Sequence, residues 1–386
     1  MVRGSCSLPV IALALGGCSL IYDPDRLPGA ATDAGDDDGD DGGGGSPLLI
    51  AIEGGVLEEG RGVDGSRPAV LRVTGQRLRS TTTFRASWVS EPGNPLDIIG
   101  HEVRDDGTAA VLALALAIDP GRSGGPRTLE IRTGDGTANE TVTIDVAMLP
   151  ELTLPAQAAM PPFLYSRIRV AGPVHVGLPN NALILRSVSS IAIDATIDVD
   201  AVAEVGGAGA CSKGLLCPGS GGISAASGGG GGGGSGGAVL VHAGGRLQAR
   251  SGAIDCPGGE GGADARRGGE GGEGRVRVDA GRLDGVPGQR VDDLVGAGVA
   301  YRGPSFDIAT PVLTRSATLD LAVLGPPTEM LTLTGPFGMR STTTDLDGLA
   351  RFVAVPVTPG IDRLCVTVAG TPEDALGRDC VEIAAP

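Results

Sequence analysis

The residues best suited to covalent chemistry in this chain are its cysteines, of which there are seven among 386 residues. Cys6 and Cys18 lie near the N-terminus. The rest lie in the body of the chain: Cys211, Cys217, Cys256, Cys365 and Cys380. Cysteines of an exported protein form disulfides by default, and the alternative is a structural metal site. Zinc is disfavoured because the C-x5-C spacing is atypical and the histidines are scattered.

Two of the body cysteines have an obvious partner. Cys365 and Cys380 fall on the last two predicted strands, where they could face each other and close the final module. Cys211 and Cys217 flank a short loop, and Cys256 could pair with either of them. We therefore treat all five as disulfide candidates, with one of the last three left over.

The other reactive residue types form no catalytic pattern. Of the histidines His101, His175 and His242, the last two lie in short β-like runs and are expected to be exposed or hydrogen-bonded structural residues. The stretch from Gly233 to Gly237 matches the G-x-S-x-G pattern, but any serine in a glycine run does, and no strand–turn–helix context surrounds it. No Gly-Lys-Ser/Thr ends the run, so it is not a P-loop. The sequence predicts no catalytic residue, no metal site and no cofactor.

One group of charged residues admits two interpretations. Its members are Arg246, Arg275, Arg277, Asp279 and Arg282. A polysaccharide-acting enzyme of the β-helix type needs a cluster of carboxylates, often with Arg or Lys, on one face of the solenoid, and these residues could form a charged face of that kind. A solvated face of a structural protein has the same appearance.

The N-terminal residues place Cys18 at the end of an export signal. Arg3 and an apolar run ending at Gly17 are typical of a secretory signal, and the run is too short to span a bilayer. The end of the run, Leu15-Gly16-Gly17-Cys18, resembles the lipobox of bacterial lipoproteins. The resemblance implies cleavage of residues 1–17, lipidation of Cys18 and stable membrane anchoring. Ser19 in place of Asp implies outer-membrane delivery. An ordinary cleaved signal is the alternative.

Residues 18–46 are predicted to form a flexible acidic and glycine-rich tether. Asp33 to Asp41 carries high charge, and Gly42 to Gly45 follows. Such a segment cannot bury enough apolar surface to order itself. An EF-hand loop is excluded because its turn position would be Asp41 instead of glycine, and no glutamate occupies the twelfth position.

Residues 47–149 have the pattern of a β-sandwich. Short apolar or alternating runs are separated by turn signals such as Asp106-Gly107 and Asp135-Gly136. The stretch from Val70 to Leu78 resembles the strand and turn of IPT/TIG immunoglobulin-like domains, which implies an immunoglobulin-like module. Trp88 is expected in the core.

Residues 150–306 are predicted to form a glycine-rich, right-handed parallel β-solenoid. Runs of three to five residues are too short to be stable alone but can stack as rungs. The stretch from Gly237 to Leu247 aligns with that from Gly274 to Leu283 after a slip of one residue. The region resembles glycine-rich bacterial surface proteins with β-helix-like cores. The unbroken run Gly228 to Gly234 is either a set of packed extended helices or a disordered loop.

Residues 307–386 are again predicted to form β-strands. The stretch from Asp345 to Gly348 is predicted to be a hairpin turn before a strand that contains Phe352. The order of turns and strands resembles small immunoglobulin-like modules of bacterial surface proteins, which implies a second β-sandwich.

The net charge and the composition of the whole chain disfavour some classes of partner. The formal net charge of −16 disfavours nucleic acid as a partner, and 2% aromatic residues disfavour stacking platforms. We expect a mainly β, non-enzymatic, lipid-anchored cell-envelope protein, attached to the outer membrane, with an adhesion, matrix or structural role. Its expected partners are the membrane and a surface polysaccharide or envelope protein. The alternatives are a polysaccharide-acting β-helix enzyme and an envelope-assembly scaffold.

Overall fold

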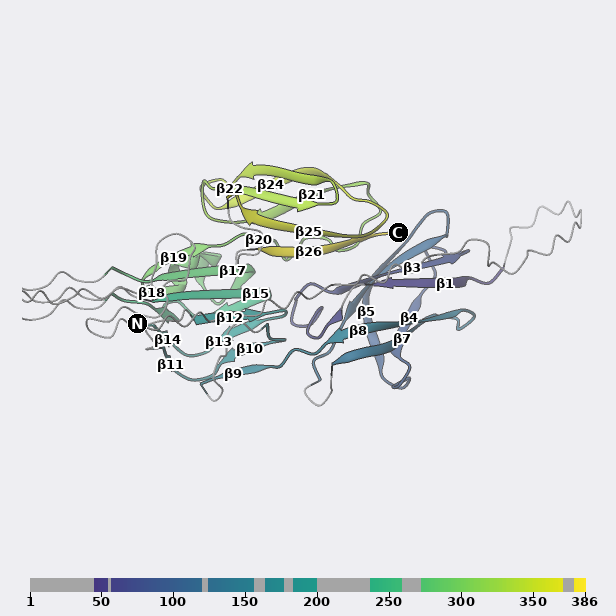
Figure 1. Ribbon diagram of the computed structural model, residues 1–386, viewed down its shortest axis with the longest axis horizontal. Coiled ribbons are helices and arrows are strands. Elements are labelled where there is room, and N and C mark those ends of the chain that lie inside the picture. The colour runs from purple at the N-terminus through teal and green to yellow at the C-terminus, as the bar shows by residue number, and fades with distance from the viewer. Residues whose placement is uncertain are drawn as a thin grey trace, which may run out of the picture. The chain divides into compact units, whose positions relative to one another are not determined.

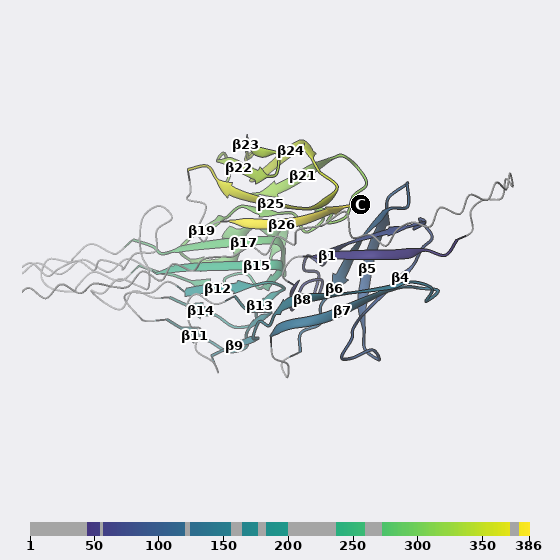
Figure 2. The ribbon, with the colours of Figure 1, turned by 45° about the vertical axis from the view of Figure 1, so that its right-hand side comes forward.

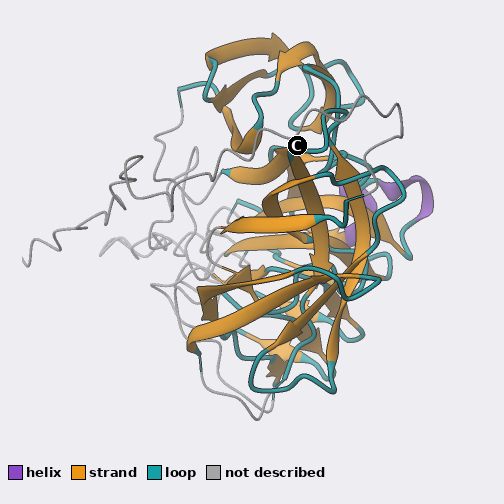
Figure 3. Cartoon of the chain, turned by 90° about the vertical axis from the view of Figure 1, so that its right-hand side faces the viewer, coloured by secondary structure: helices purple, strands orange, loops and turns teal. Residues whose placement is uncertain are grey.

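Aliphatic and β-branched residues in short alternating segments build this fold. The computed structural model describes residues 45–54, 57–119, 124–155, 164–176, 183–199, 237–258, 272–370 and 378–386. In these ranges nearly all regular structure is strand, and the helices are the short 3-10 turns η2 (Pro287–Gln289) and η3 (Val291–Leu294) (Figure 3). None of the described helices is long and apolar enough to cross a membrane. The mainly β prediction is confirmed.

The first part of the chain forms one eight-stranded sheet in the order β1-β3-β6-β5-β4-β7-β8-β2 (Figure 1). The strands are β1 (Leu48–Gly54), β2 (Leu57–Glu58), β3 (Ala69–Gln76), β4 (Phe84–Trp88), β5 (Pro95–Val103), β6 (Ala109–Ala115), β7 (Gly125–Thr133) and β8 (Asn139–Ala147). All neighbours are antiparallel except β2 and β8. The side chain of Trp88 is 3% exposed and belongs to the core of this sheet, as expected.

The predicted sandwich is corrected in one respect, because its two halves are a single continuous sheet. Strand β5 pairs with β6 from Asp97 to Val103 and with β4 at Pro95 and Leu96. A register irregularity between Ile98 and Gly100 allows β5 to bend from one half to the other. The outer strands β1 and β8 also contact each other, so the sheet approaches a closed barrel.

Two predicted turns of this sheet are confirmed. Asp106 joins β5 to β6, and its side chain accepts hydrogen bonds from the hydroxyl and the N–H of Thr108 at 2.6 and 3.0 Å. Asp135 joins β7 to β8 and accepts corresponding bonds from Thr137 and from the Thr133 hydroxyl. These hydrogen bonds hold the pKa of both carboxyl groups below the usual value.

The middle of the chain forms two sheets of parallel strands, visible as adjacent ribbons in Figures 1 and 2. The first contains β9 (Leu152–Leu154), β10 (Ile168–Val170), β12 (Leu183–Ser187), β13 (Ile191–Ile193), β15 (Ala238–Ala249), β17 (Arg275–Asp284) and β19 (Val299–Arg302). The second contains β11 (Val174–His175), β14 (Ile197–Asp198), β16 (Ile254–Asp255) and β18 (Val295–Ala297). All paired strands in the two sheets are parallel, and β12 and β13 both pair with β15, at different positions along it.

Buried aliphatic residues stack in register across these strands. One stack runs through five strands and consists of Leu152, Ile168, Ile191, Leu247 and Leu283, each at most 3% exposed. A second stack in the smaller sheet consists of Val174, Ile197, Ile254 and Val295. Both belong to one hydrophobic core. Burial of such stacks across neighbouring strands explains why strands this short are stable together.

The internal repeat aligned from the sequence has the predicted register. Ala238–Ala243 pairs with Arg275–Ala280, and after a one-residue shift Arg246 pairs with Arg282. The extra residue falls at Gly244-Gly245. A Cβ atom on Gly244 would overlap the carbonyl oxygen of Val188, so the close approach of neighbouring strands requires glycine there.

The last part of the chain forms two antiparallel sheets around a shared core. The smaller sheet contains β20 (Ser305–Phe306), β21 (Thr318–Leu324) and β24 (Leu349–Pro356). The larger contains β22 (Met330–Gly335), β23 (Gly338–Thr343), β25 (Gly360–Val368) and β26 (Asp379–Ala385). The turn at Asp345 to Gly348 is not a hairpin turn as predicted, because β23 and β24 belong to different sheets. It still ends a strand sharply, since the Asp345 carboxylate accepts the N–H groups of Asp347 and Leu349.

The three parts have separate hydrophobic cores, and residues 45–386 form one compact unit by their contacts. A small fourth cluster around Val70, Val111 and Ala384 joins the first part to the last. The signal and tether predicted for residues 1–44, the lipidation site Cys18, the glycine run and Cys211 and Cys217 lie outside the described residues.

Candidate functional site

Arginine side chains from all three parts of the described chain surround one small cavity. Its volume is about 150 Å³. The arginines that line it are Arg61, Arg67, Arg186, Arg363 and Arg378. Among the described residues, the carboxylates that line it are Glu58 and Asp379, and His242 lines it as well. The lining is thus rich in positive charge, although the chain as a whole is strongly acidic.

The parallel sheet contributes Arg186 and His242. Along β12 the residues alternate between buried and half-buried, which turns Arg186 to the outer face of the sheet while Leu185 enters the core. Arg186 lies beside His242 of β15 in the ladder, and His242 lies beside Asp279 of β17. Parallel stacking therefore puts three residues from distant points of the sequence in one row.

A buried ion pair closes one side of the cavity. Arg67 donates from its two terminal nitrogens to the two carboxylate oxygens of Asp379, each at 2.9 Å, and to the carbonyl groups of Phe306 and Cys380. Asp379 also accepts the Phe306 N–H at 2.8 Å. Burial alone would raise the pKa of Asp379, but the charge and hydrogen bonds of Arg67, the nearby His242 and the Phe306 N–H hold it below the usual value.

A second, more open ion pair lies beside it. The Arg61 guanidinium bonds the Glu58 carboxylate at 2.8 Å through Nε, and one terminal nitrogen lies 3.9 Å from Glu382. These side chains are between a fifth and a quarter exposed. Arg61 and Arg67 are therefore already neutralised by carboxylates.

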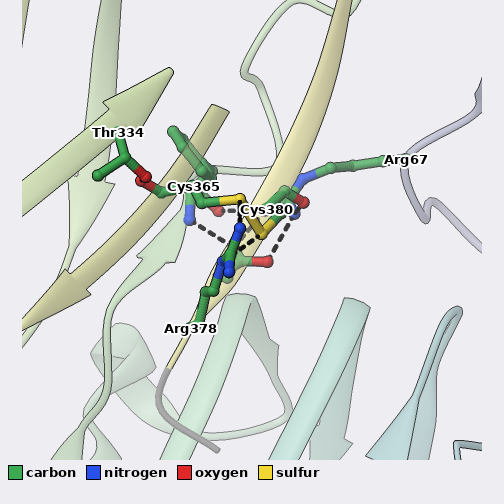
Figure 4. Close-up of a disulfide and its surroundings, with 7 residues drawn as sticks. Arg67, Thr334, Cys365, Arg378 and Cys380 are labelled. Carbon is green, nitrogen blue, oxygen red and sulfur yellow. Dashed lines mark hydrogen bonds and ion pairs between the residues drawn. A yellow bond between two sulfur atoms is a disulfide. The ribbon is translucent and has the colours of Figure 1, made fainter. Parts of the chain in front are cut away.

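The other three arginines of the cavity have no carboxylate partner within the described ranges. The side chains of Arg186 and Arg363 make no hydrogen bond or ion pair within these ranges, and the Nε of Arg186 is buried without a partner. Arg378 donates to the sulfur atoms of Cys380 and Cys365 at 3.2 and 2.9 Å (Figure 4). Sulfur is a weak acceptor, so the charge of Arg378 is not compensated by this contact.

Cys365 and Cys380 form a disulfide next to this cavity (Figure 4). They are cross-strand partners in β25 and β26 of one sheet. The bond therefore links the last two strands of the chain, as expected from the sequence. It does not join the two sheets of the last module. Among the other candidates, Cys256 is fully buried in the core of the parallel sheets, and its pairing stays a prediction.

Replacing Cys365 and Cys380 together by serine should lower the free energy of unfolding by about 2–3 kcal/mol, because the bond closes a loop of 15 residues. Urea denaturation of both proteins under oxidising conditions measures this change. The same measurement in a reducing agent is the control, because the two proteins should then differ by less than about 1 kcal/mol. Equal stability under oxidising conditions would contradict a bond that constrains the chain.

The charged group noted in the sequence lies on one face of the parallel sheet, but it is not uniformly solvated. Arg246, Arg275 and Arg282 are exposed, whereas Asp279 is 1% exposed. Arg277 bonds both carboxylate oxygens of Asp279 at 2.8 and 3.0 Å. His242 lies 3.6 Å from the same carboxylate. Asp279 is thus held by a structural ion pair.

The remaining histidines have structural surroundings too. His175 is exposed and its Nδ1 lies 3.2 Å from the Asp198 carboxylate. The His101 ring packs edge-on against Phe84 with ring centres 5.6 Å apart. The contact of His175 agrees with the expectation of an exposed or hydrogen-bonded position. The side chain of His242 is 13% exposed and lies 3.6 Å from Asp279, which is beyond hydrogen-bond distance.

A second cavity of about 460 Å³ lies on the first sheet, and three of the charged side chains that line it are engaged. Arg127 stacks on the face of Trp88 at 4.1 Å and bonds Glu91 at 2.8 Å. Two lining carboxylates, Glu59 and Asp119, also have partners. The arginine-lined cavity is therefore the better candidate for a site.

Sequence analysis did not find the arginine-lined cavity. Its arginines are spread over more than 300 positions, from Arg61 to Arg378, and no two share a motif. The one feature of the sequence that could have indicated it is that Arg363 and Arg378 each lie two residues before a cysteine of the predicted Cys365–Cys380 pair.

Comparisons with known proteins add little. No family model matches the chain, and no curated protein matches it. Among solved structures, a chain described as "D0-D1 domain of Intimin" aligns with 88% of this chain and 98% of its own length. The identity is 8% and the TM-score 0.14, so no argument about fold or function rests on this likeness.

Proposed function

We propose that this chain is a non-enzymatic, lipid-anchored cell-envelope protein with an adhesion, matrix or structural role at the cell surface. The observation that supports the proposal most is the interior of the parallel sheets. Stacked aliphatic residues such as Ile191 and Leu247 fill it, so binding has to use the outer surface. The predicted export signal and the lipobox-like sequence ending at Cys18 would provide the lipid that anchors the protein to the membrane.

The parallel sheets are best interpreted as turns of one right-handed β-solenoid. Their residue stacks keep register from β9 to β17, and the strands of the smaller sheet follow in the same order. Right-handed crossovers between parallel strands are by far the more common. A rigid ladder of this kind is a suitable support for modules that bind at a distance from the membrane.

The flanking modules are proposed to be immunoglobulin-like. The first has the IPT/TIG-like stretch from Val70 to Leu78 in β3 and the following turn, and the last has two antiparallel sheets around a common core. The disulfide of the last module departs from antibody domains, where the bond links the two sheets.

Protease treatment of intact cells tests the surface location. We expect the segment beyond Pro47 to be digested on intact cells, with a periplasmic protein as the control that survives. Survival of the segment until the outer membrane is broken would contradict a surface role and favour envelope scaffolding.

Lipid attachment is tested by replacing Cys18 with serine. The variant should lose all incorporation of labelled fatty acid and accumulate as a precursor, because the acceptor thiol is gone. A Cys6→Ser variant is the matched control, since residue 6 leaves with the signal, and it should be labelled and processed normally. Continued labelling of the Cys18→Ser protein would show that the lipobox interpretation is wrong.

The class of partner separates adhesion from scaffolding. Adhesion or matrix binding predicts that the purified body binds surface polysaccharides in a glycan array. A scaffold predicts no glycan binding and capture of a specific envelope protein by cross-linking in cells.

A further inference from the structure

We propose that the arginine-lined cavity binds a tetrahedral oxyanion, a sulfate or phosphate group carried by a small ligand. This inference is independent of the envelope location and of lipid attachment. It starts from the three arginines of the cavity that no described carboxylate neutralises, namely Arg186, Arg363 and Arg378.

Uncompensated like charges that share a small space repel one another. Glu58 and Asp379 do not relieve this repulsion, because Arg61 and Arg67 already engage these carboxylates. The row on the parallel sheet does not relieve it either, because Arg186 has His242 as its neighbour, and the next residue, Asp279, is bound by Arg277. An anion bound in the cavity would offset the repulsion among the three arginines.

The arrangement of the donors selects the kind of anion. Arg186 comes from β12, Arg363 from β25 and Arg378 from the residue before β26. Guanidinium groups from separate elements suit the oxygens of a tetrahedral group, whereas a planar carboxylate is satisfied by one bidentate arginine, as Asp379 is by Arg67. Two negative charges also balance three cations better than one.

The size of the cavity selects a compact group. Its volume of about 150 Å³ is well below the roughly 300–1,000 Å³ of pockets that enclose drug-sized molecules. A single sulfate or phosphate group fits this space, and the rest of a larger ligand would remain outside. Two of the lining residues, Arg363 and Arg378, are exposed to solvent, which allows such entry.

Titration calorimetry of the purified protein with potassium sulfate and potassium phosphate, at ionic strength held constant with potassium chloride, tests the proposal. We expect saturable binding of one anion per chain. In the double variant Arg186→Gln/Arg363→Gln the affinity should fall at least tenfold, because two charge-assisted contacts are lost. The side chains of these two arginines have no partner among the described residues, so the variant loses no internal bond that the described part of the chain makes.

The matched control is Arg85→Gln/Arg351→Gln, which removes the same charge from two exposed strand positions in β4 and β24. Its affinity should stay within about twofold. Equal loss in both double variants, or no saturable binding to the unaltered protein, would overturn the proposal. Thermal stabilisation by sulfate alone is not a sufficient readout, because sulfate stabilises most proteins by exclusion from their surface.

Titration with three sugar derivatives then shows whether the bound group is a sulfate ester, a phosphate ester or a carboxylate. Glucose 6-sulfate, glucose 6-phosphate and glucuronate are titrated under the same conditions. Binding of either ester, weakened in the pocket variant, supports the proposal and separates sulfate from phosphate. Stronger binding of glucuronate than of both esters would overturn the tetrahedral assignment.

Discussion

Replacing Arg67 by methionine should lower the free energy of unfolding by about 4 kcal/mol, the largest effect we expect of a single substitution. Arg67 is 10% and Asp379 7% exposed, so the change leaves a buried carboxylate without its counter-ion. It also removes the hydrogen bonds that Arg67 donates to the carbonyl groups of Phe306 and Cys380. Urea denaturation at pH 7, followed by circular dichroism, measures the change.

The control is Arg315→Met, which breaks another ion pair between the first and last parts of the chain. Arg315 bonds Glu102 at 2.6 Å, but these side chains are 45% and 37% exposed, so the loss should be below about 1 kcal/mol. The double variant Arg67→Met/Asp379→Leu should recover much of the stability, because no charge is then left buried. A double variant as unstable as Arg67→Met would show that the cost has another origin.

The effect of Arg67→Met should depend on pH. In the unaltered protein the pKa of Asp379 is lowered in the folded state, so its contribution to stability is present above the unfolded pKa and is lost as pH falls through the folded value. Without Arg67, burial dominates and raises the pKa of the Asp379 carboxyl. The difference in stability between the two proteins should therefore shrink as pH is lowered from 7 towards 4. A difference independent of pH would mean that Asp379 is not the charge left unpaired.

Replacing Leu247 by alanine should cost about 3 kcal/mol. Leu247 is fully buried and lies between Ile191 and Leu283 in the stack that runs through five strands. Truncation leaves a cavity that neighbouring rungs cannot fill, because their backbones are held by ladder hydrogen bonds on both sides. Thermal and urea unfolding of the purified variant measure the cost.

Gln248→Ala is the matched control for Leu247→Ala. The two residues are adjacent in β15, but Gln248 faces outward and is exposed. Its truncation should change stability by less than about 0.5 kcal/mol. Similar effects of the two substitutions would contradict the inward direction of the stack and with it the solenoid interpretation.

Local signals were predicted well from the sequence. The turns at Asp106 and Asp135 were found because Asp-Gly pairs adopt the required backbone and the carboxylate caps it. The repeat at 237–247 and 274–283 was aligned with the correct one-residue slip, because parallel stacking places like residues at like positions. The pairing of Cys365 with Cys380 followed from their places on neighbouring strands.

Relations between strands were predicted less well. The sequence did not indicate that β5 pairs with different neighbours at its two ends and so makes one sheet of two halves. It shows a turn at Asp345, but not that the turn leads into the other sheet. In each case the alternating pattern records which side of a strand is buried, and several pairings are compatible with the same pattern.

By itself, then, the sequence determined what depends on neighbouring residues: the β character, the turns at Asp106 and Asp135, and the repeat. The export signal and the lipidation of Cys18 stay predictions. Tertiary structure alone decided the candidate site. Arg61, Arg67, Arg186, Arg363 and Arg378 meet in one cavity although the chain separates them widely. Whether an arginine there is paired or uncompensated depends on which carboxylate the fold places within bonding distance. Coulombic attraction acts across space, and spacing along a sequence does not report it.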